Sequence, residues 1–250
     1  MVKYLIMKIK FNIHPLYYII AFICFITGHF KGYIIYTLII LVHEFGHIFA
    51  GLILKWPILK VTIYPFGCMT TFNNKLNSSS IEEFLILIYG PLFQILFNMI
   101  YPTNYHYFIL IFNLLPIYPL DGSKLLFLLL NKIISYYYSY VYIFIISYVT
   151  IILLLINRFN FINLIILLYI AYDVYRYSRL LPNIMYKFYY ERYKYKYKYK
   201  YDNIIIGNNR YKMCKEKNNY FIIDNICYNE YNILKQFFER GSIYEIENKF

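Results

Sequence analysis

The pentapeptide His43-Glu44-Phe45-Gly46-His47 has the residue types and the spacing of a metal-dependent hydrolase. In a helix, residues four apart lie on one face about one turn apart, so both imidazoles would face the same point. Two neutral imidazoles can share one Zn²⁺, and Glu44 can then serve as general base toward a water molecule. The motif alone is a moderate signal, so its surroundings must decide what it means.

Those surroundings are apolar on both sides, from Tyr33 to Leu54. The run is long enough to cross a bilayer, which takes about 20 residues. At ~1.5 Å per residue, His43 would lie ~15 Å into the run, near mid-membrane. Ionisable groups at that depth are costly and are usually functional. The alternative, that the histidines only bond neighbouring helices, would bury Glu44 for no purpose.

Composition separates the chain into two parts. Of its 250 residues, 60% are hydrophobic and 23% aromatic, which exceeds the level of soluble domains. Only five of the thirteen acidic residues precede Pro182. We therefore expect an α-helical polytopic membrane domain over residues 1–181 and a small α+β cytoplasmic tail over residues 182–250.

The net charge of +12 is explained by the membrane rather than by nucleic acid. Excess Lys and Arg mark the cytoplasmic flanks of a polytopic protein and attract anionic lipid, so we expect a lipid bilayer and no nucleic acid as partner. The four cysteines show no metal-type spacing and are expected to be free thiols in a reducing compartment.

About six spans are predicted, and the distribution of Lys and Arg places both termini in the cytoplasm. The fourth span is interrupted by Pro116 and Pro119 and resumes after Asp121-Gly122. The outer turns contain His29 and His106, both expected to be exposed loop histidines. The predicted spans are 15–30, the motif helix, 81–100, the interrupted stretch 108–130, 137–156 and 161–177.

Asp121 is a carboxylate with apolar sequence on both sides, and a broken helix at membrane depth is tolerated only where it lines a cavity or site. Asp173 differs, because Arg176 follows it at i+3 and a plain ion pair explains it. In the third span, Gln94 and Asn98 lie four residues apart on one face. Either they hydrogen-bond to neighbouring helices or they hold the backbone of a substrate.

The segment from Lys60 to Asn74 is not helical in pattern: β-branched residues are followed by Pro65 and Gly67. It predicts a short, membrane-associated hairpin. In the tail, Arg192 to Tyr201 alternates Lys and Tyr, which in an extended segment would place lysines on one face, toward anionic headgroups. Beyond it we expect a strand at 220–223 and a helix at 229–239, ended by Gly241.

With these residues in place, the sequence resembles the site-2 protease family of intramembrane zinc metalloproteases, and within it the branch found in sporulating bacteria. That family pairs HExxH with a later Asn-x-x-Pro…Leu-Asp-Gly, which here reads Asn113-Leu-Leu-Pro116-Ile-Tyr-Pro-Leu-Asp121-Gly122. Two further stretches, Tyr64-Pro-Phe-Gly67 and Tyr89-Gly-Pro-Leu92, fall where the sporulation branch has similar ones. The likeness covers residues 1 to about 180.

The resemblance implies one Zn²⁺ per chain, held by His43, His47 and Asp121, with Glu44 as catalytic base. It also implies substrate contacts at Pro65, Phe66, Gly67 and Asn113. The substrate would be a membrane-associated protein, such as an inactive sigma-factor precursor, and regulatory membrane proteins would be further partners. The location would be the membrane around the forespore if the source forms spores.

The sequence departs from the family pattern at Gly67-Cys68 and at Ser123-Lys124, where the family usually has Gly-Gly and Gly-Arg. These changes concern the shape of the pocket. The tail resembles at most a short, degenerate part of the CBS domain of the sporulation branch. Two other readings stay open: a membrane metalloprotease with a glutamate as third ligand, and a degenerate family member that binds or carries zinc without cleaving protein.

Overall fold

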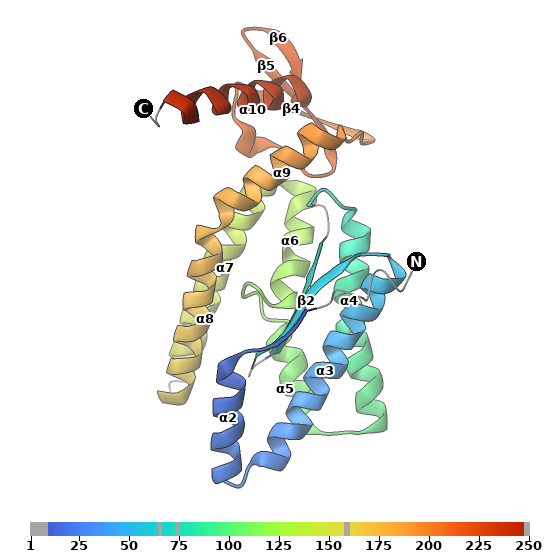
Figure 1. Ribbon diagram of the computed structural model, residues 1–250, viewed down its shortest axis with the longest axis vertical. Helices are drawn as coiled ribbons and strands as arrows, with labels where there is room; N and C mark the ends of the chain where they lie inside the picture. The colour runs from blue at the N-terminus through green and yellow to red at the C-terminus, as the bar shows by residue number, and fades with distance from the viewer. Residues whose placement is uncertain (1–9, 65–66, 74–75, 158–160, 248–250) are drawn as a thin grey trace. The chain divides into compact units, whose positions relative to one another are not determined.

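The apolar segments of the chain fold into helices that belong to two units (Figure 1). The structure is a computed structural model that describes residues 10–64, 67–73, 76–157 and 161–247. One unit contains the described residues of 1–74 and 80–115. The other contains those of 75–79 and 116–250. The histidines of the motif therefore belong to the first unit, and Asp121 belongs to the second.

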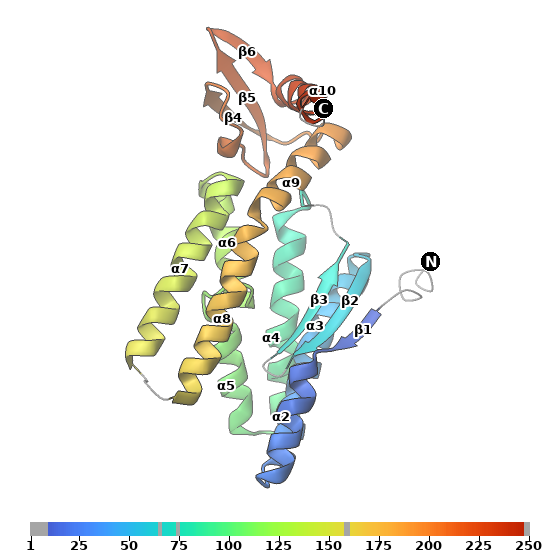
Figure 2. The same ribbon diagram turned by 60° about the vertical axis from the view of Figure 1, so that its left-hand side comes forward.

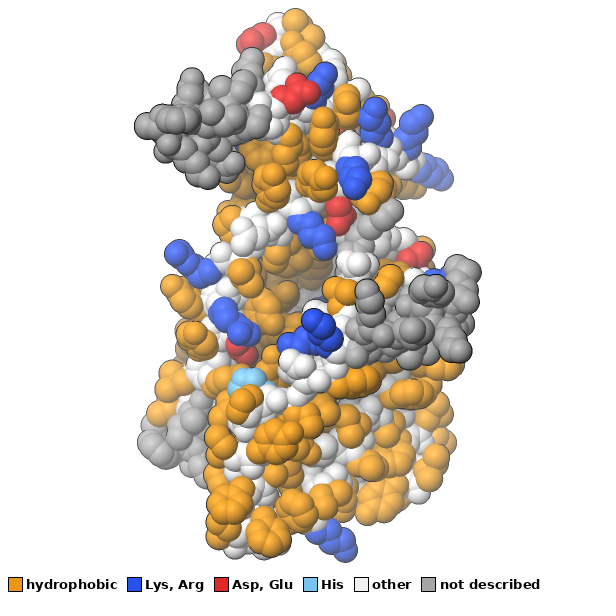
Figure 3. Space-filling model, in the orientation of Figure 1, with side chains coloured by type: hydrophobic (Ala, Val, Ile, Leu, Met, Phe, Trp, Pro, Cys, Tyr) orange, Lys and Arg blue, Asp and Glu red, His pale blue; other side chains and the backbone are white. Residues whose placement is uncertain are grey.

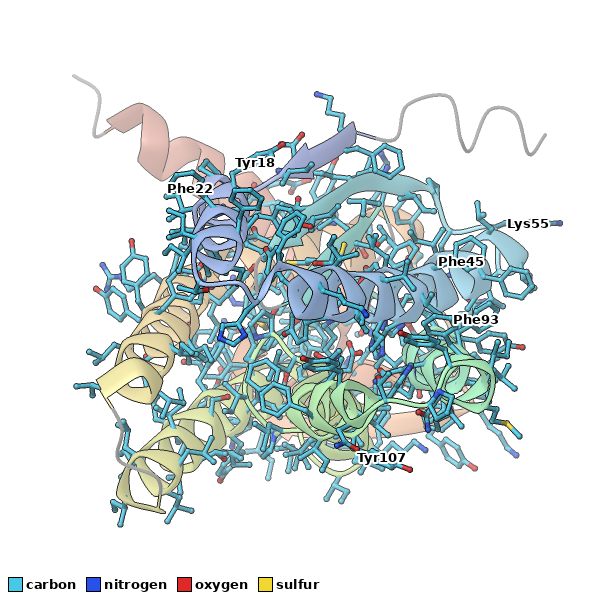
Figure 4. All side chains as sticks on the ribbon, turned by 90° about the horizontal axis from the view of Figure 1, so that it is seen from below. Tyr18, Phe22, Phe45, Lys55, Phe93 and Tyr107 are labelled. Carbon is cyan, nitrogen blue, oxygen red and sulfur yellow. The ribbon has the colours of Figure 1, made fainter. Side chains whose placement is uncertain are left out.

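In the first unit, the motif helix α3 and the following helix α4 pack side by side (Figure 1). Close approach requires glycine: a Cβ on Gly46 of α3 would overlap the backbone of Tyr89 in α4. The ring centroids of Phe45 and Phe93 lie 5.8 Å apart across the same contact. Both residues are labelled in Figure 4. The helices of this unit are α2 (Pro15–Ile26), α3 (Phe30–Ile53), α4 (Ser80–Ile100) and α5 (Asn104–Asn113).

A three-stranded sheet in the same unit lies along α3 (Figure 2). Its central strand β2 (Ile58–Tyr64) pairs antiparallel with β3 (Gly67–Phe72), in the segment where the hairpin is predicted. The other neighbour is β1 (Lys10–Ile13), which runs parallel to β2 and was not predicted. Since β2 is central, one edge of the sheet is β1 and the other is β3.

The second unit begins with α6, whose first residue is Asp121, and the chain between α5 and α6 is not helical, as the prolines predict. Helices α7 and α8 pack against each other, and α8 leads directly into α9. The helices of this unit are α6 (Asp121–Ile133), α7 (Tyr136–Asn157), α8 (Phe161–Arg179), α9 (Leu181–Tyr195) and α10 (Glu230–Glu247), with a 3-10 turn η1 at Arg210–Lys212.

A second sheet, of order β4-β5-β6, forms the tail with α10 against one face (Figure 2). Its core contains Ile205, Phe221 and Leu234, each at most 2% exposed. β4 runs parallel to β5, and β5 runs antiparallel to β6. The strands are β4 (Tyr201–Ile206), β5 (Lys217–Ile223) and β6 (Ile226–Asn229).

Two predictions for the tail are wrong. The Lys-Tyr run is not extended throughout, because α9 continues to Tyr195 and Lys196 ends it in a left-handed conformation. The last helix does not stop before Gly241 but extends to Glu247. A glycine inside a helix costs only about 1 kcal/mol relative to alanine, so it does not by itself end one.

Within the described residues, three helices are long and apolar enough to cross a membrane: α3, α4 and α7. α2 is apolar too but has only 12 residues. Hydrophobic side chains cover the surface around α2 and α3 in Figure 3, and Phe45 is 53% exposed. This is the surface of a protein whose helices face lipid, although the number of about six spans stays a prediction.

Candidate metal centre

Helix α3 brings His43, Glu44 and His47 into the interior of the first unit, where each is about 5% exposed (4%, 6% and 6%). The four-residue spacing places the two imidazoles one turn apart, with ring centroids 4.9 Å from each other. Their Nε2 atoms approach to 3.1 Å. Two nitrogens bound to one tetrahedral zinc at about 2.0–2.1 Å would stand about 3.3 Å apart, so this separation fits a shared metal ion.

The other nitrogen of each ring is tied to α4. His47 Nδ1 lies 2.8 Å from the carbonyl oxygen of Ile86, which can only accept, so this nitrogen carries the hydrogen. His43 Nδ1 lies 2.8 Å from Oε1 of Gln94. The amide of Gln94 is oriented by its own Nε2, which donates to the carbonyl of His106 at 2.8 Å. His43 Nδ1 is therefore a donor as well.

These hydrogen bonds determine what the pair of histidines can do. In neutral rings with both Nδ1 atoms protonated, each Nε2 presents a lone pair toward the other. Two lone pairs at 3.1 Å repel unless a cation, a proton or a metal ion, lies between them. The Nδ1-anchored, Nε2-presenting arrangement is the one that metal-binding histidines adopt, with the second nitrogen bonded to a carbonyl.

The backbone of α4 closes the site on one side. A Cβ on Gly90 would overlap Nε2 of His47 and would come within 2.9 Å of Nε2 of His43, so only glycine fits there. Pro91 follows, and because it has no N–H it leaves the carbonyl of Leu87 without its usual helical donor. Gly90 thus lets the backbone of α4 approach both imidazoles closely.

Glu44 lies beside the first sheet as well as beside His43. Burial and, second, the nearby Glu44 carboxylate raise the pKa of the Cys68 thiol in β3. Cys68 also packs against Ile39 and Ile40 of α3. The strand that begins at Gly67 is therefore close to the carboxylate for which a catalytic role is predicted.

Asp121 is the first residue of α6 in the second unit and is 6% exposed. Lys124, one turn later, approaches its Oδ1 at 3.2 Å. Both aspartates thus have a cation three residues later, since Asp173 pairs with Arg176 at 2.9 Å. An ion pair of this kind does not distinguish Asp121 from Asp173. Burial separates them better, since the side chain of Asp173 is 19% exposed. The carboxylate of Asp121 is a donor of a type that zinc accepts, and its place as third ligand stays a prediction.

The structure describes some of the remaining predicted residues but not all of them. Gly67 is the first residue of β3, and Asn113 is the last residue of α5 and is half-buried. Pro65 and Phe66 lie outside the described residues. His29 is exposed as predicted, but His106 is 3% exposed and its Nε2 donates to the carbonyl of Tyr101, so its assignment as an exposed loop histidine is wrong.

Comparison with known proteins gives two similar ones. Stage IV sporulation protein FB of Bacillus subtilis (strain 168) is 38% identical over 146 residues, an alignment covering 52% of this chain and 51% of that protein. The chain thus matches about half the length of this curated relative. A site-2 protease from Methanocaldococcus jannaschii superposes with a TM-score of 0.53 at 19% identity, covering 68% of this chain and 91% of that structure. No family model matches.

The predicted resemblance to the site-2 protease family is therefore confirmed. The structural match shows that the chain shares the fold of the site-2 protease from Methanocaldococcus jannaschii. At 19% identity, this match is evidence for the fold alone. Together with the three apolar helices, these relatives identify the chain as a membrane protein.

Proposed function

We propose that this protein is an intramembrane zinc metalloendopeptidase that cleaves a membrane-associated protein. The observation that carries the proposal is the pair of buried histidines in α3, whose Nε2 lone pairs converge at 3.1 Å while both Nδ1 atoms are anchored to α4. The order of the two motifs in the sequence and the likeness to a site-2 protease fold support the same assignment.

His43 and His47 would hold one zinc ion, and Asp121 would supply the third ligand. Two imidazoles and one carboxylate are a common donor set for catalytic zinc and keep a fourth position available. The buried carboxylate of Asp121 is of the right type, and its first-turn position in α6 suits a negative charge. Zinc bound there would polarise the scissile carbonyl and lower the pKa of a water molecule to about 7.

Glu44 would act as the general base and then as the general acid. Its carboxylate would accept a proton from the attacking water and would pass it to the amine that leaves when the peptide bond breaks. Glu44 directly follows His43 in α3, and its burial keeps it away from bulk water. In this scheme Glu44 is not a ligand, so it can be replaced without loss of the metal.

The first sheet offers a place for the substrate. A transmembrane helix must be unwound before one of its peptide bonds can be attacked, and pairing with an exposed strand edge would hold it extended. The sheet has two edge strands, β1 and β3. We assign the substrate to the edge of β3, which begins at Gly67, because Cys68 of this strand interacts with the Glu44 carboxylate. Pro65, Phe66 and Asn113 would add contacts to the substrate.

The identity of the substrate rests on the resemblance. An inactive sigma-factor precursor, processed during sporulation at the membrane around the forespore, is the substrate that the sporulation branch suggests. The similar protein of Bacillus subtilis is named as a sporulation protein. Regulatory membrane proteins would be further partners, and both termini would face the cytoplasm.

The test is to measure zinc together with cleavage in the purified, detergent-solubilised protein and in His43→Ala. The probe is a membrane-associated segment of a sigma-factor precursor fused to a reporter, presented in the same micelles. We expect about one zinc per wild-type chain, little zinc in His43→Ala, and cleavage only by the wild type. A wild-type protein that binds no zinc, or a His43→Ala variant that cleaves at the wild-type rate, would overturn the proposal.

A further inference from the structure

We infer that Gln94 is a positioning residue for the metal centre, because the orientation of its amide decides whether the His43 nitrogen that faces the metal carries the ring hydrogen. This inference rests on the proposed zinc function. It assigns to α4 a side chain that would not itself touch the zinc ion or the substrate.

The two histidines are anchored differently. His47 is oriented by a backbone carbonyl, that of Ile86, which is an acceptor whatever side chain residue 86 carries. His43 is oriented by a side chain, and an amide side chain can bond in either of two orientations. The tautomer of His43 that can bind a metal ion therefore depends on the orientation of one side-chain amide. The corresponding tautomer of His47 depends on a backbone carbonyl, which has a fixed role as acceptor.

Turning the amide over would reverse the tautomer. With Nε2 of Gln94 toward the ring, His43 Nδ1 would have to accept a hydrogen bond, and the ring hydrogen would move to the nitrogen that faces His47. A protonated nitrogen cannot bind a metal ion, so the reversed amide would remove one ligand. The observed orientation, with Oε1 accepting from His43, keeps that nitrogen available.

The carbonyl of His106 prevents the reversal. It lies 2.8 Å from Nε2 of Gln94, and a reversed amide would bring two oxygen acceptors together in the interior, where Gln94 is only 1% exposed. His106 is itself held: its ring donates to the carbonyl of Tyr101 and packs on Phe97 at 5.5 Å. The carbonyl of His106 near the start of α5 thus sets the orientation of the Gln94 amide. That amide in turn sets the tautomer of His43.

The same contacts settle the choice that the sequence leaves open for Gln94. Its oxygen is engaged by His43 and its nitrogen by His106, so neither end is directed at the backbone of a substrate. Asn98, one turn further along α4, makes no such contact with the histidines among the hydrogen bonds of the described residues, and it serves as the matched control.

The experiment measures the zinc dissociation constant of the full-length protein in detergent by competition with a chelator. Gln94→Leu removes the acceptor and should weaken zinc binding about 10–100-fold, the usual cost of losing such an outer partner. Gln94→Glu with its carboxyl protonated keeps both contacts, because one oxygen accepts from His43 Nδ1 and the O–H donates to the carbonyl of His106. We therefore expect its zinc affinity to lie within a few-fold of the wild type under conditions in which this carboxyl is protonated. Asn98→Leu should leave the affinity unchanged.

A second readout separates positioning from general loss of structure. With Co²⁺ in place of zinc, the visible absorption of the metal should change in Gln94→Leu but not in Asn98→Leu, at equal thermal stability of the two variants. If Gln94→Leu does not fold, Gln94→Asn takes its place, because its amide is one methylene too short to reach both partners, and the same loss is expected.

The outcomes distinguish this inference from the function on which it rests. A wild-type protein that binds no zinc contradicts the proposed function itself. A wild type that binds zinc, with Gln94→Leu or Gln94→Asn binding equally well, overturns the role of Gln94 alone. Equal losses in Gln94→Leu and Asn98→Leu would also overturn it, since they would reflect packing of α4 rather than the contact with His43.

Discussion

One nitrogen of each histidine in the motif, Nε2, faces that of the other ring at 3.1 Å. The motif His43-Glu44-x-x-His47 predicts that two imidazoles share a face, and the structure adds which nitrogen of each ring is anchored. That second fact could not be read from the sequence. The anchors are a backbone carbonyl at Ile86 and an amide at Gln94, some 40 to 50 positions away along the chain, and only packing of α4 on α3 brings them to the rings.

The proposal that Asp121, and not Asp173, is the third zinc ligand can be tested with single substitutions. We expect Asp121→Ala to weaken zinc affinity by more than the 10–100-fold loss of an outer partner, because it removes a ligand, so the purified variant should contain little zinc. Asp173→Ala should retain the zinc of the wild type, since it only breaks the pair with Arg176. Zinc content of the purified variants is measured by atomic emission.

Lys124→Ala is the control for Asp121, because it breaks the 3.2 Å ion pair without removing the carboxylate. It should keep most of its zinc. Equal zinc contents in Asp121→Ala and Asp173→Ala would mean that the third ligand is a different residue.

At the scale of elements, the pairing of α3 with α4 makes the site. Much of it follows from sequence: the long apolar helices, the interruption between α5 and α6, and the pair β2–β3 all occupy the predicted segments. The strand β1 was missed because four residues with Lys and Asn have little strand character, and they pair with β2 some 50 positions later. β6 was missed because the turn at Asp224-Asn225, with both residues at positive φ, was not recognised as a hairpin signal.

Gly90 tests the contact between these two helices. A Cβ there would meet both imidazoles, so Gly90→Ala should push His43 and His47 apart, lower zinc affinity and cost about 1–3 kcal/mol in stability through overpacking. Leu92→Ala is the control on the same helix, since its side chain is 43% exposed. The zinc dissociation constant and the melting temperature are measured for both, and a Gly90→Ala variant with wild-type zinc affinity would contradict the geometry.

At the scale of the whole molecule, the second unit is held by a buried charge. Arg192 is 1% exposed and donates to Glu230 at 2.7 Å, to the carbonyls of Lys215 and Lys217, and to Asn77. It therefore joins α9, the start of α10, the η1–β5 connection and the loop before α4. The sequence pattern predicts that Arg192 lies in a Lys-Tyr run that faces anionic headgroups, because composition alone does not show which of many cations is buried.

Removing this cation should loosen the tail. Taking away one partner of a buried ion pair costs about 3–5 kcal/mol, so Arg192→Met should make the tail sheet far more sensitive to limited proteolysis. Arg176→Met, which removes a cation whose side chain is 50% exposed, should cost about 0–1 kcal/mol and leave the cleavage pattern unchanged. A tail equally resistant in wild type and Arg192→Met would show that the network is not what stabilises it.

The most direct test of the proposed mechanism is the paired measurement of zinc content and cleavage rate in Glu44→Gln. This substitution keeps the shape of the side chain and all three proposed ligands, but it removes the group that accepts the proton. We predict one zinc per chain, as in the wild type, with cleavage of the reporter fusion reduced at least 10²–10⁴-fold, the contribution of a positioned acid–base group. Proteolysis near the wild-type rate in zinc-loaded Glu44→Gln would contradict the assignment of Glu44 as the catalytic base.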